Sequence, residues 1–155
     1  MSNSLPNRKS LNHGISRWVP DGGHFFITIN CAERRENQLC LNRISAQLKE
    51  SIQIRVNAGE WDVRLWLLMP DHIHAIMSFA PWVSMSQSIT DWKSYTARTL
   101  GINWQQGFFD DRLRSDRETE DKECYVVLNP VRAALCDYPS EWKFRWSSFD
   151  FEVNR

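Results

Sequence analysis

The chain has 155 residues, a length that suits one domain with a substantial core. Hydrophobic residues make up 42% of the sequence and include eight Trp and eight Phe, a composition that excludes an intrinsically disordered chain. Basic and acidic residues number 19 each, and this balance disfavours a strongly basic nucleic-acid-binding protein while still allowing a local basic patch.

The four cysteines show neither a Cys-x-x-Cys pair nor the spacing of a zinc ribbon. The sequence shows no signal peptide and no apolar run of membrane length, so we expect a cytoplasmic protein that does not associate with membranes. There the thiols should be reduced, and we expect all four side chains to be buried as small hydrophobic groups. They are Cys31, Cys40, Cys124 and Cys136.

Residues 1–23 are polar and broken by proline and glycine, which predicts a flexible N-terminal arm, and we expect a single domain over residues 24–155. Residues 24–31 alternate between two faces, as a half-buried first strand does. One face carries Phe25, Ile27, Ile29 and Cys31, and the other carries His24, Phe26, Thr28 and Asn30.

Two later segments have hydrophobic residues at helical spacing, and each is followed by a glycine, Gly59 or Gly101, that suits a helix C-terminus. Between these helices, residues 61–79 form two apolar runs around a Met-Pro-Asp turn, which predicts a β-hairpin. Residues 108–114 predict a short fourth strand. The helical stripes are Leu41, Ile44, Leu48, Ile52 and Val56 in the first helix, and Met85, Ile89, Trp92, Thr96 and Leu100 in the second.

The order strand, helix, strand, strand, helix, strand is that of a ferredoxin-like, or split βαβ, fold of the α+β class. Its antiparallel sheet carries two helices on one face and leaves the other face open. If the helices cover the face that bears Ile27 and Ile73, then His72 and His74 lie on the open face.

His72 and His74 begin the second strand of the hairpin, and side chains two residues apart project from the same face, roughly 6 to 7 Å apart at Cα. One interpretation is a pair of ligands or reactive groups. The other is a pair of polar residues on the solvated side of an antiparallel strand. A third ligand or a nucleophile elsewhere in the chain would favour the first interpretation.

Ser115 and Glu118 form a capping-box pattern, which predicts a helix that runs to about Leu128. Tyr125 and Asn129 lie four residues apart on a flank of this helix, one above the other. Because this is the one sizeable helix left to cover the open sheet face, its docking would bring a phenol and an amide oxygen to the two imidazoles. Its expected apolar stripe is Cys124, Val127, Leu128 and Val131.

Two imidazole nitrogens and an Asn carbonyl oxygen suit Mg²⁺ or Mn²⁺ completed by water and phosphate oxygens, and such an ion polarises a phosphodiester. A tyrosine that attacks the phosphate conserves the bond energy as a phosphotyrosine ester, so a broken strand can be rejoined without ATP. The structural alternatives are that Tyr125 anchors its helix to the sheet and that Asn129 is the N-cap of a following short helix.

Several sequence blocks occur in a specific order between residues 24 and 149: MPDHIHAIM, DWKSYTARTL, GFFDDRLRS, Tyr125 followed by LNPVRAAL, and WKFRWSSF. This ordered set resembles the REP-associated tyrosine transposases, in the superfamily of HUH single-tyrosine transposases. The resemblance implies a ferredoxin-like fold and a divalent metal ion. It also implies nicking and joining of single-stranded DNA beside REP-type hairpins, through a 5′-phosphotyrosine and a free 3′ hydroxyl, in DNA transposition by a monomer or homodimer.

By matching position, the resemblance makes His72 and His74 the metal-binding pair, Tyr125 the nucleophile and Asn129 a third metal ligand. Several cations are candidate contacts to DNA. The alternatives are that they neutralise a helix end, lie on a solvated surface, or are balanced by neighbouring aspartates on a strand edge. These cations are Lys93, Arg132 and, on one face of the fourth strand, Arg112 and Arg114.

Two classes of function remain open. One is a metal-dependent single-stranded DNA transesterase. The other is a catalytically inactive or domesticated module of the same fold that binds hairpins or single strands by stacking and phosphate contacts. Retention of both histidines, Tyr125 and Asn129 favours the enzyme. A third option, a His-x-His phosphoesterase acting on a nucleotide, leaves Tyr125 without a role.

Overall fold

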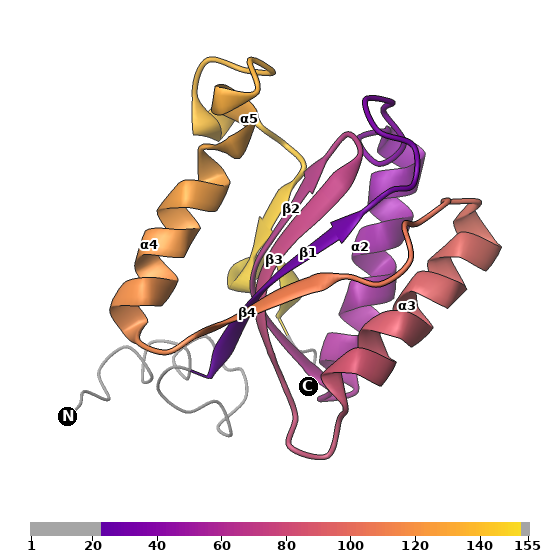
Figure 1. Ribbon diagram of the computed structural model, residues 1–155, viewed down its shortest axis with the longest axis vertical. Helices are drawn as coiled ribbons and strands as arrows, with labels where there is room; N and C mark the ends of the chain where they lie inside the picture. Colours follow the sequence, from indigo (N-terminus) through magenta and orange to yellow (C-terminus); the bar gives the residue numbers. More distant parts are fainter. Residues whose placement is uncertain (1–22, 153–155) are drawn as a thin grey trace.

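The computed structural model describes residues 23–152 and shows a five-stranded antiparallel sheet with helices on both faces (Figure 1). The strands are β1 (His24–Asn30), β2 (Trp61–Met69), β3 (His72–Phe79), β4 (Phe109–Leu113) and β5 (Arg145–Ser147). The helices are α2 (Asn42–Asn57), α3 (Met85–Leu100), α4 (Asp116–Val127) and α5 (Asn129–Arg132), with 3₁₀ turns η1 (Pro139–Glu141) and η2 (Ser148–Phe151). The strand order β4-β1-β3-β2-β5 confirms the predicted ferredoxin-like, α+β fold. Apart from Gly23, the arm predicted for residues 1–23 lies outside the described residues.

The β2–β3 hairpin forms as predicted and sits in the middle of the sheet, with β1 on the other side of β3. In the β1–β3 register, Thr28 lies opposite His74 and Asn30 lies opposite His72. Side chains paired across antiparallel strands point to the same face, so these four polar residues share one face.

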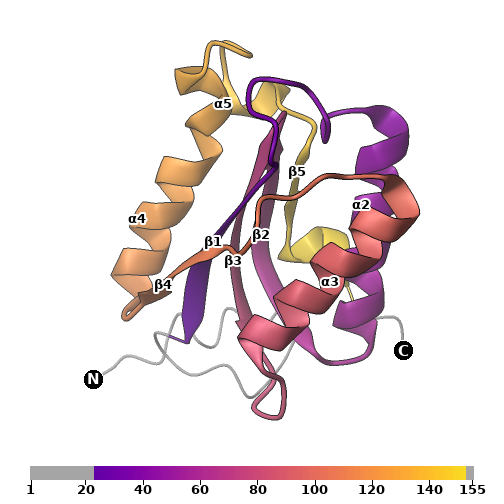
Figure 2. The same cartoon turned by 45° about the vertical axis from the view of Figure 1, so that its right-hand side comes forward.

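Helices α2 and α3 both cover the other face, which bears Ile27 and Ile73 (Figure 2). Three buried tryptophans lie at the centre of this core. The ring centroids of Trp61 and Trp66 are 6.0 Å apart, and those of Trp66 and Trp92 are 5.4 Å apart. Each large aromatic side chain buries a large apolar surface area, so this cluster should supply a major part of the free energy of folding.

The ends of the two helices follow from their sequence. Ser84 caps α3, with its Oγ accepting a hydrogen bond from the N–H of Gln87, and Gly101 ends the helix at a left-handed φ of 72°. The predicted stripe of α2 is buried except for Leu41, which is exposed. Leu41 lies just before the helix in extended backbone, so helical spacing does not place its side chain.

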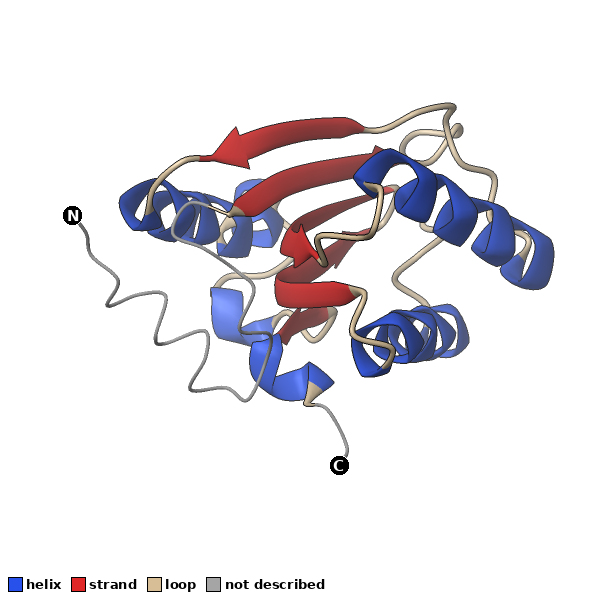
Figure 3. Cartoon of the chain, turned by 90° about the horizontal axis from the view of Figure 1, so that it is seen from below, coloured by secondary structure: helices blue, strands red, loops and turns tan. Residues whose placement is uncertain are grey.

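Helix α4 lies on the opposite side of the sheet from α2 and α3, as the view from below shows (Figure 3). It covers a second hydrophobic cluster, formed by Leu65, Leu67, Met69, Ile76, Leu113 and Val126. The predicted docking face of α4 is only partly right: Val127 packs against this cluster, whereas Cys124 and Leu128 are exposed, and the buried residues of the helix are Thr119 and Val126. Thr119 and Val126 are two turns apart and lie on the same side of the helix.

Ser115 begins α4 as predicted, because its Oγ accepts a hydrogen bond from the N–H of Glu118. The carboxylate of Glu118 accepts from the N–H of Arg114 rather than from Ser115, so the reciprocal half of the capping box is displaced by one residue. This arrangement fixes the start of the helix directly after β4.

Strand β5 is an element that the sequence did not predict. It pairs with the edge of β2, placing Trp146 opposite Trp66, and the indole N–H of Trp142 donates to the carbonyl of Leu68. This aromatic segment packs on the domain through Trp146, which is buried, whereas Phe149 is exposed. No helix within residues 23–152 has the length and apolar character needed to cross a membrane.

We expect Val126→Ala to lower the free energy of unfolding by about 2 kcal/mol, because it opens a cavity in the cluster beneath α4. Cys124→Ala, on the exposed side of the same helix, should change it by less than about 0.5 kcal/mol. Urea unfolding monitored by tryptophan fluorescence measures both. If Cys124→Ala lowers the free energy of unfolding more than Val126→Ala does, α4 docks through the face predicted from the sequence.

Candidate active site

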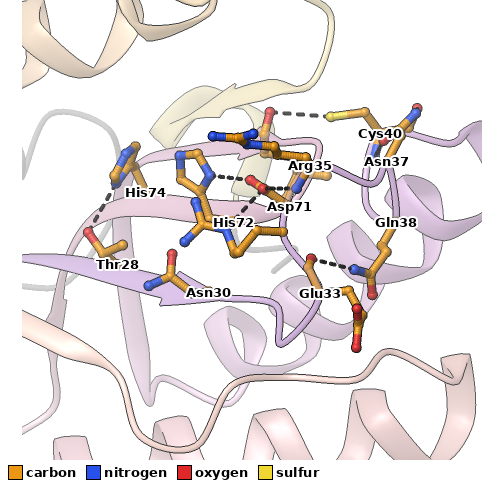
Figure 4. Close-up of polar contacts among 12 residues, drawn as sticks. Thr28, Asn30, Glu33, Arg35, Asn37, Gln38, Cys40, Asp71, His72 and His74 are labelled. Atoms are coloured by element: carbon orange, nitrogen blue, oxygen red, sulfur yellow. Dashed lines mark hydrogen bonds and ion pairs between the residues drawn. The ribbon is translucent and has the colours of Figure 1, made fainter.

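His72 and His74 come together on the face that α4 partly covers, with ring centroids 4.8 Å apart and ring planes at 75°. Each ring is held through Nδ1: Asp71 Oδ1 lies 2.7 Å from Nδ1 of His72, and Thr28 Oγ1 lies 3.1 Å from Nδ1 of His74 (Figure 4). Within residues 23–152 no hydrogen bond engages either Nε2 atom, so both remain available to a ligand.

Asp71 is itself fixed by the loop that follows β1. Its Oδ2 accepts from the guanidinium of Arg34 at 3.0 Å and from the backbone N–H of Arg35 at 2.7 Å. Burial alone would raise the pKa of this carboxyl, but the hydrogen bonds from Arg34, Arg35 and His72 outweigh burial and lower it well below its usual range. The carboxylate is therefore ionised when it orients His72.

The imidazole of His74 is neutral at ordinary pH. Burial is the main cause that lowers its pKa to about 3, and the charges of His72, Lys122 and Arg132 lower it further. A neutral imidazole with a lone pair on Nε2 is the form that binds metal ions.

Tyr125 reaches this pair through an unbroken series of side-chain contacts. The ring of Phe26 stacks on His74 at 5.2 Å between centroids, and Nζ of Lys122 lies 4.6 Å from the centroid of Phe26. The same Nζ lies 5.2 Å from the centroid of Tyr125. The structure therefore brings the tyrosine predicted on α4 to the side of the sheet that carries the histidines.

The second neighbour of the tyrosine ring is Arg132. Its Cζ lies 4.1 Å from the centroid of Tyr125, and one of its N–H groups donates to the carbonyl oxygen of Tyr125 at 2.7 Å. Tyr125 is 51% exposed, and its hydroxyl has no hydrogen-bond partner in the described part of the chain. A tyrosine that only anchors a helix to the sheet would be buried or hydrogen-bonded, so the accessible, unpaired phenol argues against that alternative.

Asn129 begins α5, one turn after Tyr125, and is half-buried. Its side chain makes no hydrogen bond among the described residues, and Leu128 occupies the N-cap position without a side-chain cap. The alternative role of Asn129 as an N-cap is therefore wrong, and its amide oxygen is available. Between residues 23 and 152 no cluster of three or more His, Cys, Asp or Glu could hold a metal ion.

A family model described as Transposase IS200 like matches residues 24–115, which include the histidine pair and end where α4 begins. The chain belongs to the IS200-like transposase family. It is 24% identical over 142 residues to the REP-associated tyrosine transposase of Escherichia coli strain K12, covering 90% of this chain and 84% of that protein. The solved structure of a REP-associated tyrosine transposase bound to a REP hairpin has the same fold, with a TM-score of 0.69 and 24% identity, over 84% of this chain and 79% of that one. The resemblance to REP-associated tyrosine transposases that the sequence blocks indicated is confirmed.

The other predicted cations of this transposase lie apart from the histidines. Lys93, on α3, donates to the carbonyls of Gln105 and Gly107, and burial lowers its pKa. Arg112 pairs with Phe25 and lies over its ring at 5.7 Å, on the face covered by α2 and α3.

Strand β4 is one residue shorter at each end than the predicted 108–114, so Arg114 lies just beyond it and its common face with Arg112 stays a prediction. Beyond the end of a strand, the alternation of side chains no longer determines which face of the sheet a side chain points to. The backbone N–H of Arg114 is instead part of the α4 cap.

The cysteines are free thiols, as predicted, within the described residues. Burial and the charge of Asp71 raise the pKa of Cys31 and of Cys40 to about 12, which makes both unreactive. The expectation that all four are buried is wrong: Cys31 is buried, Cys40 and Cys136 are only partly buried, and Cys124 is exposed. Cys124 is exposed because the side of α4 that carries it does not face the sheet.

Sequence reasoning missed the residues that connect and orient the predicted ones. Lys122 lies one helical turn before Tyr125, and this spacing alone could have identified it as a neighbour. Asp71 directly precedes His72. Phe26 and Thr28 fall on the β1 face opposite the hydrophobic stripe, but their partners depend on the β1–β3 register.

A polar cluster anchors α4 beside this site. The guanidinium of Arg64 binds Glu123 of α4 through two hydrogen bonds of 2.7 and 3.1 Å. Asp62 and Ser78 pair across β2 and β3 on the same face of the sheet. Asp62 is buried, its Oδ2 has no hydrogen-bond partner among the described residues, and burial raises its pKa to about 7 despite the charge of Arg64.

This buried acid predicts a pH dependence of stability. The pKa of Asp62 is about 7 in the folded protein and near 3.8 when unfolded, so between these values the folded state binds more protons. The stability that protonated Asp62 contributes is therefore lost as pH rises from about 4 to about 7. Above about pH 7 the effect of Asp62 on the free energy of unfolding no longer changes with pH. Relative to Asp62→Asn, the wild type should lose about 4 kcal/mol over this range.

Urea unfolding of the wild type and of Asp62→Asn at several pH values measures the difference between their free energies of unfolding. The effects of other titrating groups cancel in this difference. Ser78→Ala removes a neighbouring polar group that does not titrate, and its effect should be the same at every pH. A difference between wild type and Asp62→Asn that stays constant from pH 4 to pH 8 would contradict the raised pKa of Asp62.

Proposed function

We propose that this chain is a metal-dependent transesterase that cuts and rejoins single-stranded DNA through Tyr125. The observation that carries the proposal is the contact series from Tyr125 through Lys122 and Phe26 to the histidine pair. It joins an accessible phenol to two imidazoles on one side of the sheet. Family membership supports the same function, because the family is one of transposases.

The residues fit a divalent metal ion. Nε2 of His72 and of His74 and the amide oxygen of Asn129 would hold Mg²⁺ or Mn²⁺. When bound, the ion would supply Lewis-acid polarisation of the phosphodiester. Asp71 and Thr28 hold the two rings in fixed orientations, so little conformational entropy is lost on binding.

The chemical step is an exchange of esters. The phenol oxygen of Tyr125 forms a bond to phosphorus while the bond from phosphorus to the 3′ oxygen breaks, leaving a 5′-phosphotyrosine and a 3′ hydroxyl. The phenol proton passes through solvent to the departing oxygen, so the step is balanced without another reactant. Since one ester replaces another, the reverse reaction rejoins a strand.

We propose that the substrate is a single strand beside a hairpin. A relative with the same fold has been solved bound to a REP hairpin, which supports this class of substrate. The formal net charge of zero leaves little long-range attraction for duplex DNA. Shape and stacking should therefore carry much of the affinity, as in other single-strand binding proteins.

The decisive prediction is a covalent adduct. Incubation with Mn²⁺ and a hairpin oligonucleotide labelled on the side that carries the 5′ phosphate should yield a protein–DNA band on a denaturing gel. Tyr125→Phe removes one hydroxyl and should abolish the band. Tyr138→Phe, which changes another exposed tyrosine in the same way, should retain it.

The same gel separates the other functions. Cleavage without any adduct, retained in Tyr125→Phe, would establish a phosphoesterase that uses water. Hairpin binding without cleavage in the wild type, across several hairpins and both metals, would establish a binding module and overturn the transesterase.

A second prediction concerns the metal. EDTA should abolish adduct formation, and His72→Ala should weaken Mn²⁺ binding by more than about 100-fold, beyond what loss of an outer hydrogen-bond partner costs. Asn30→Ala, which removes the half-buried polar side chain opposite His72, should bind Mn²⁺ as the wild type does. Calorimetric titration with Mn²⁺ measures both, and equal affinities for His72→Ala and wild type would exclude the histidine site.

A further inference from the structure

We infer that Lys122 and Arg132 together form a phosphate clamp that holds the scissile phosphate of the DNA strand on the His74 side of Tyr125. This inference rests on the proposed function for its choice of ligand, and it adds a residue, Lys122, that is not one of the metal-binding or nucleophilic groups. It is carried by the way in which the two cations flank one tyrosine ring.

The surroundings of Lys122 leave its charge available. Its Nζ lies over the rings of Phe26 and Tyr125, and it makes no ion pair or hydrogen bond within the described residues. An aromatic face attracts a cation without neutralising it, so the ammonium can still bind an anion. Arg132 uses one N–H group on the carbonyl of Tyr125 and keeps further donors.

The neighbours of Lys122 favour the His74 side for the phosphate. A hollow of about 330 Å³ beside Lys122 and Tyr125 is also lined by Leu113 and by three acids, Asp111, Glu118 and Asp121, which would repel a phosphodiester. Lys122 also lies over the ring of Phe26, which stacks on His74 at 5.2 Å between centroids. Both cations lie close to the phenol ring, with Nζ of Lys122 5.2 Å and Cζ of Arg132 4.1 Å from the centroid of Tyr125.

The geometry also explains why two cations are needed. In the transfer, negative charge moves between the phenol oxygen and the 3′ oxygen while the phosphoryl oxygens remain charged. Positive groups fixed beside both the phenol and the phosphate favour this charge more than mobile water does. Lys122 is held by Phe26, a residue of the sheet, so its position is set by the fold rather than by DNA.

The test uses the full-length Tyr125→Phe protein, which binds without cutting, and a hairpin oligonucleotide with a single-stranded flank. Each flank phosphate is replaced in turn by a neutral methylphosphonate. Lys122→Met, which keeps the length of the side chain, should weaken binding of the natural oligonucleotide about 10-fold. At one methylphosphonate position this loss should disappear, because the phosphate charge that Lys122 binds is already absent.

In the protein that retains Tyr125, that position should be the cut position, and Lys122→Met should slow adduct formation while Lys122→Arg retains part of the rate. Lys143→Met is the matched control, because Lys143 also lies over an aromatic ring, that of Phe144, and is exposed. It should change neither binding nor rate.

A loss in Lys122→Met that is equal at every methylphosphonate position, or no loss at all, would overturn the clamp and leave Lys122 as a cover for Phe26. If the wild type forms no adduct, the proposed transesterase fails. The methylphosphonate scan still reads binding alone, so the clamp is supported or overturned independently of cleavage.

Discussion

The arrangement of the site depends on the need to cover a hydrophobic patch on the sheet face that α2 and α3 leave open. Leu67 is paired with His74 and Met69 with His72, so apolar side chains of β2 share this face with the histidines. Helix α4 buries the apolar side chains by inserting Val126. Tyr125 directly precedes Val126 and is therefore presented on the flank of the helix. The hydrophobic effect thus places Tyr125, although half of the tyrosine itself is exposed.

The sequence predicted the histidine pair because strand parity and a Pro-containing turn act locally. Once the turn sets the hairpin register, the faces of Ile73 and His74 follow without further information. The docking face of α4 could not be predicted in this way, because its few hydrophobic residues form no continuous stripe. Its orientation is decided by Arg64 and Phe26, which are distant in sequence. Strand β5 was missed for the same reason, since three residues gain a partner only through long-range pairing with β2.

The neutral total charge is compatible with a site for DNA because electrostatic effects between exposed groups fade over about 10 Å. Arg132 lies over the ring of Tyr125, whereas Asp111 and two further acids line the neighbouring hollow together with Lys122. A strand that enters such a site experiences a local gradient of charge, which orients its backbone. A uniformly basic surface would bind duplex and single strand alike and would supply no such orientation.

The partners of each cation decide whether it is available to DNA. Lys93 is occupied by two backbone carbonyls and Arg64 by a carboxylate, so each would have to give up strong hydrogen bonds before it could bind a phosphate. Lys122 lies only on aromatic faces, and Arg132 keeps unused donors beside one. In a chain with as many acids as bases, placing cations against aromatic rings keeps them ordered while leaving their charge unpaired. We therefore expect the contacts to DNA from the two cations that lie over the ring of Tyr125, Lys122 and Arg132.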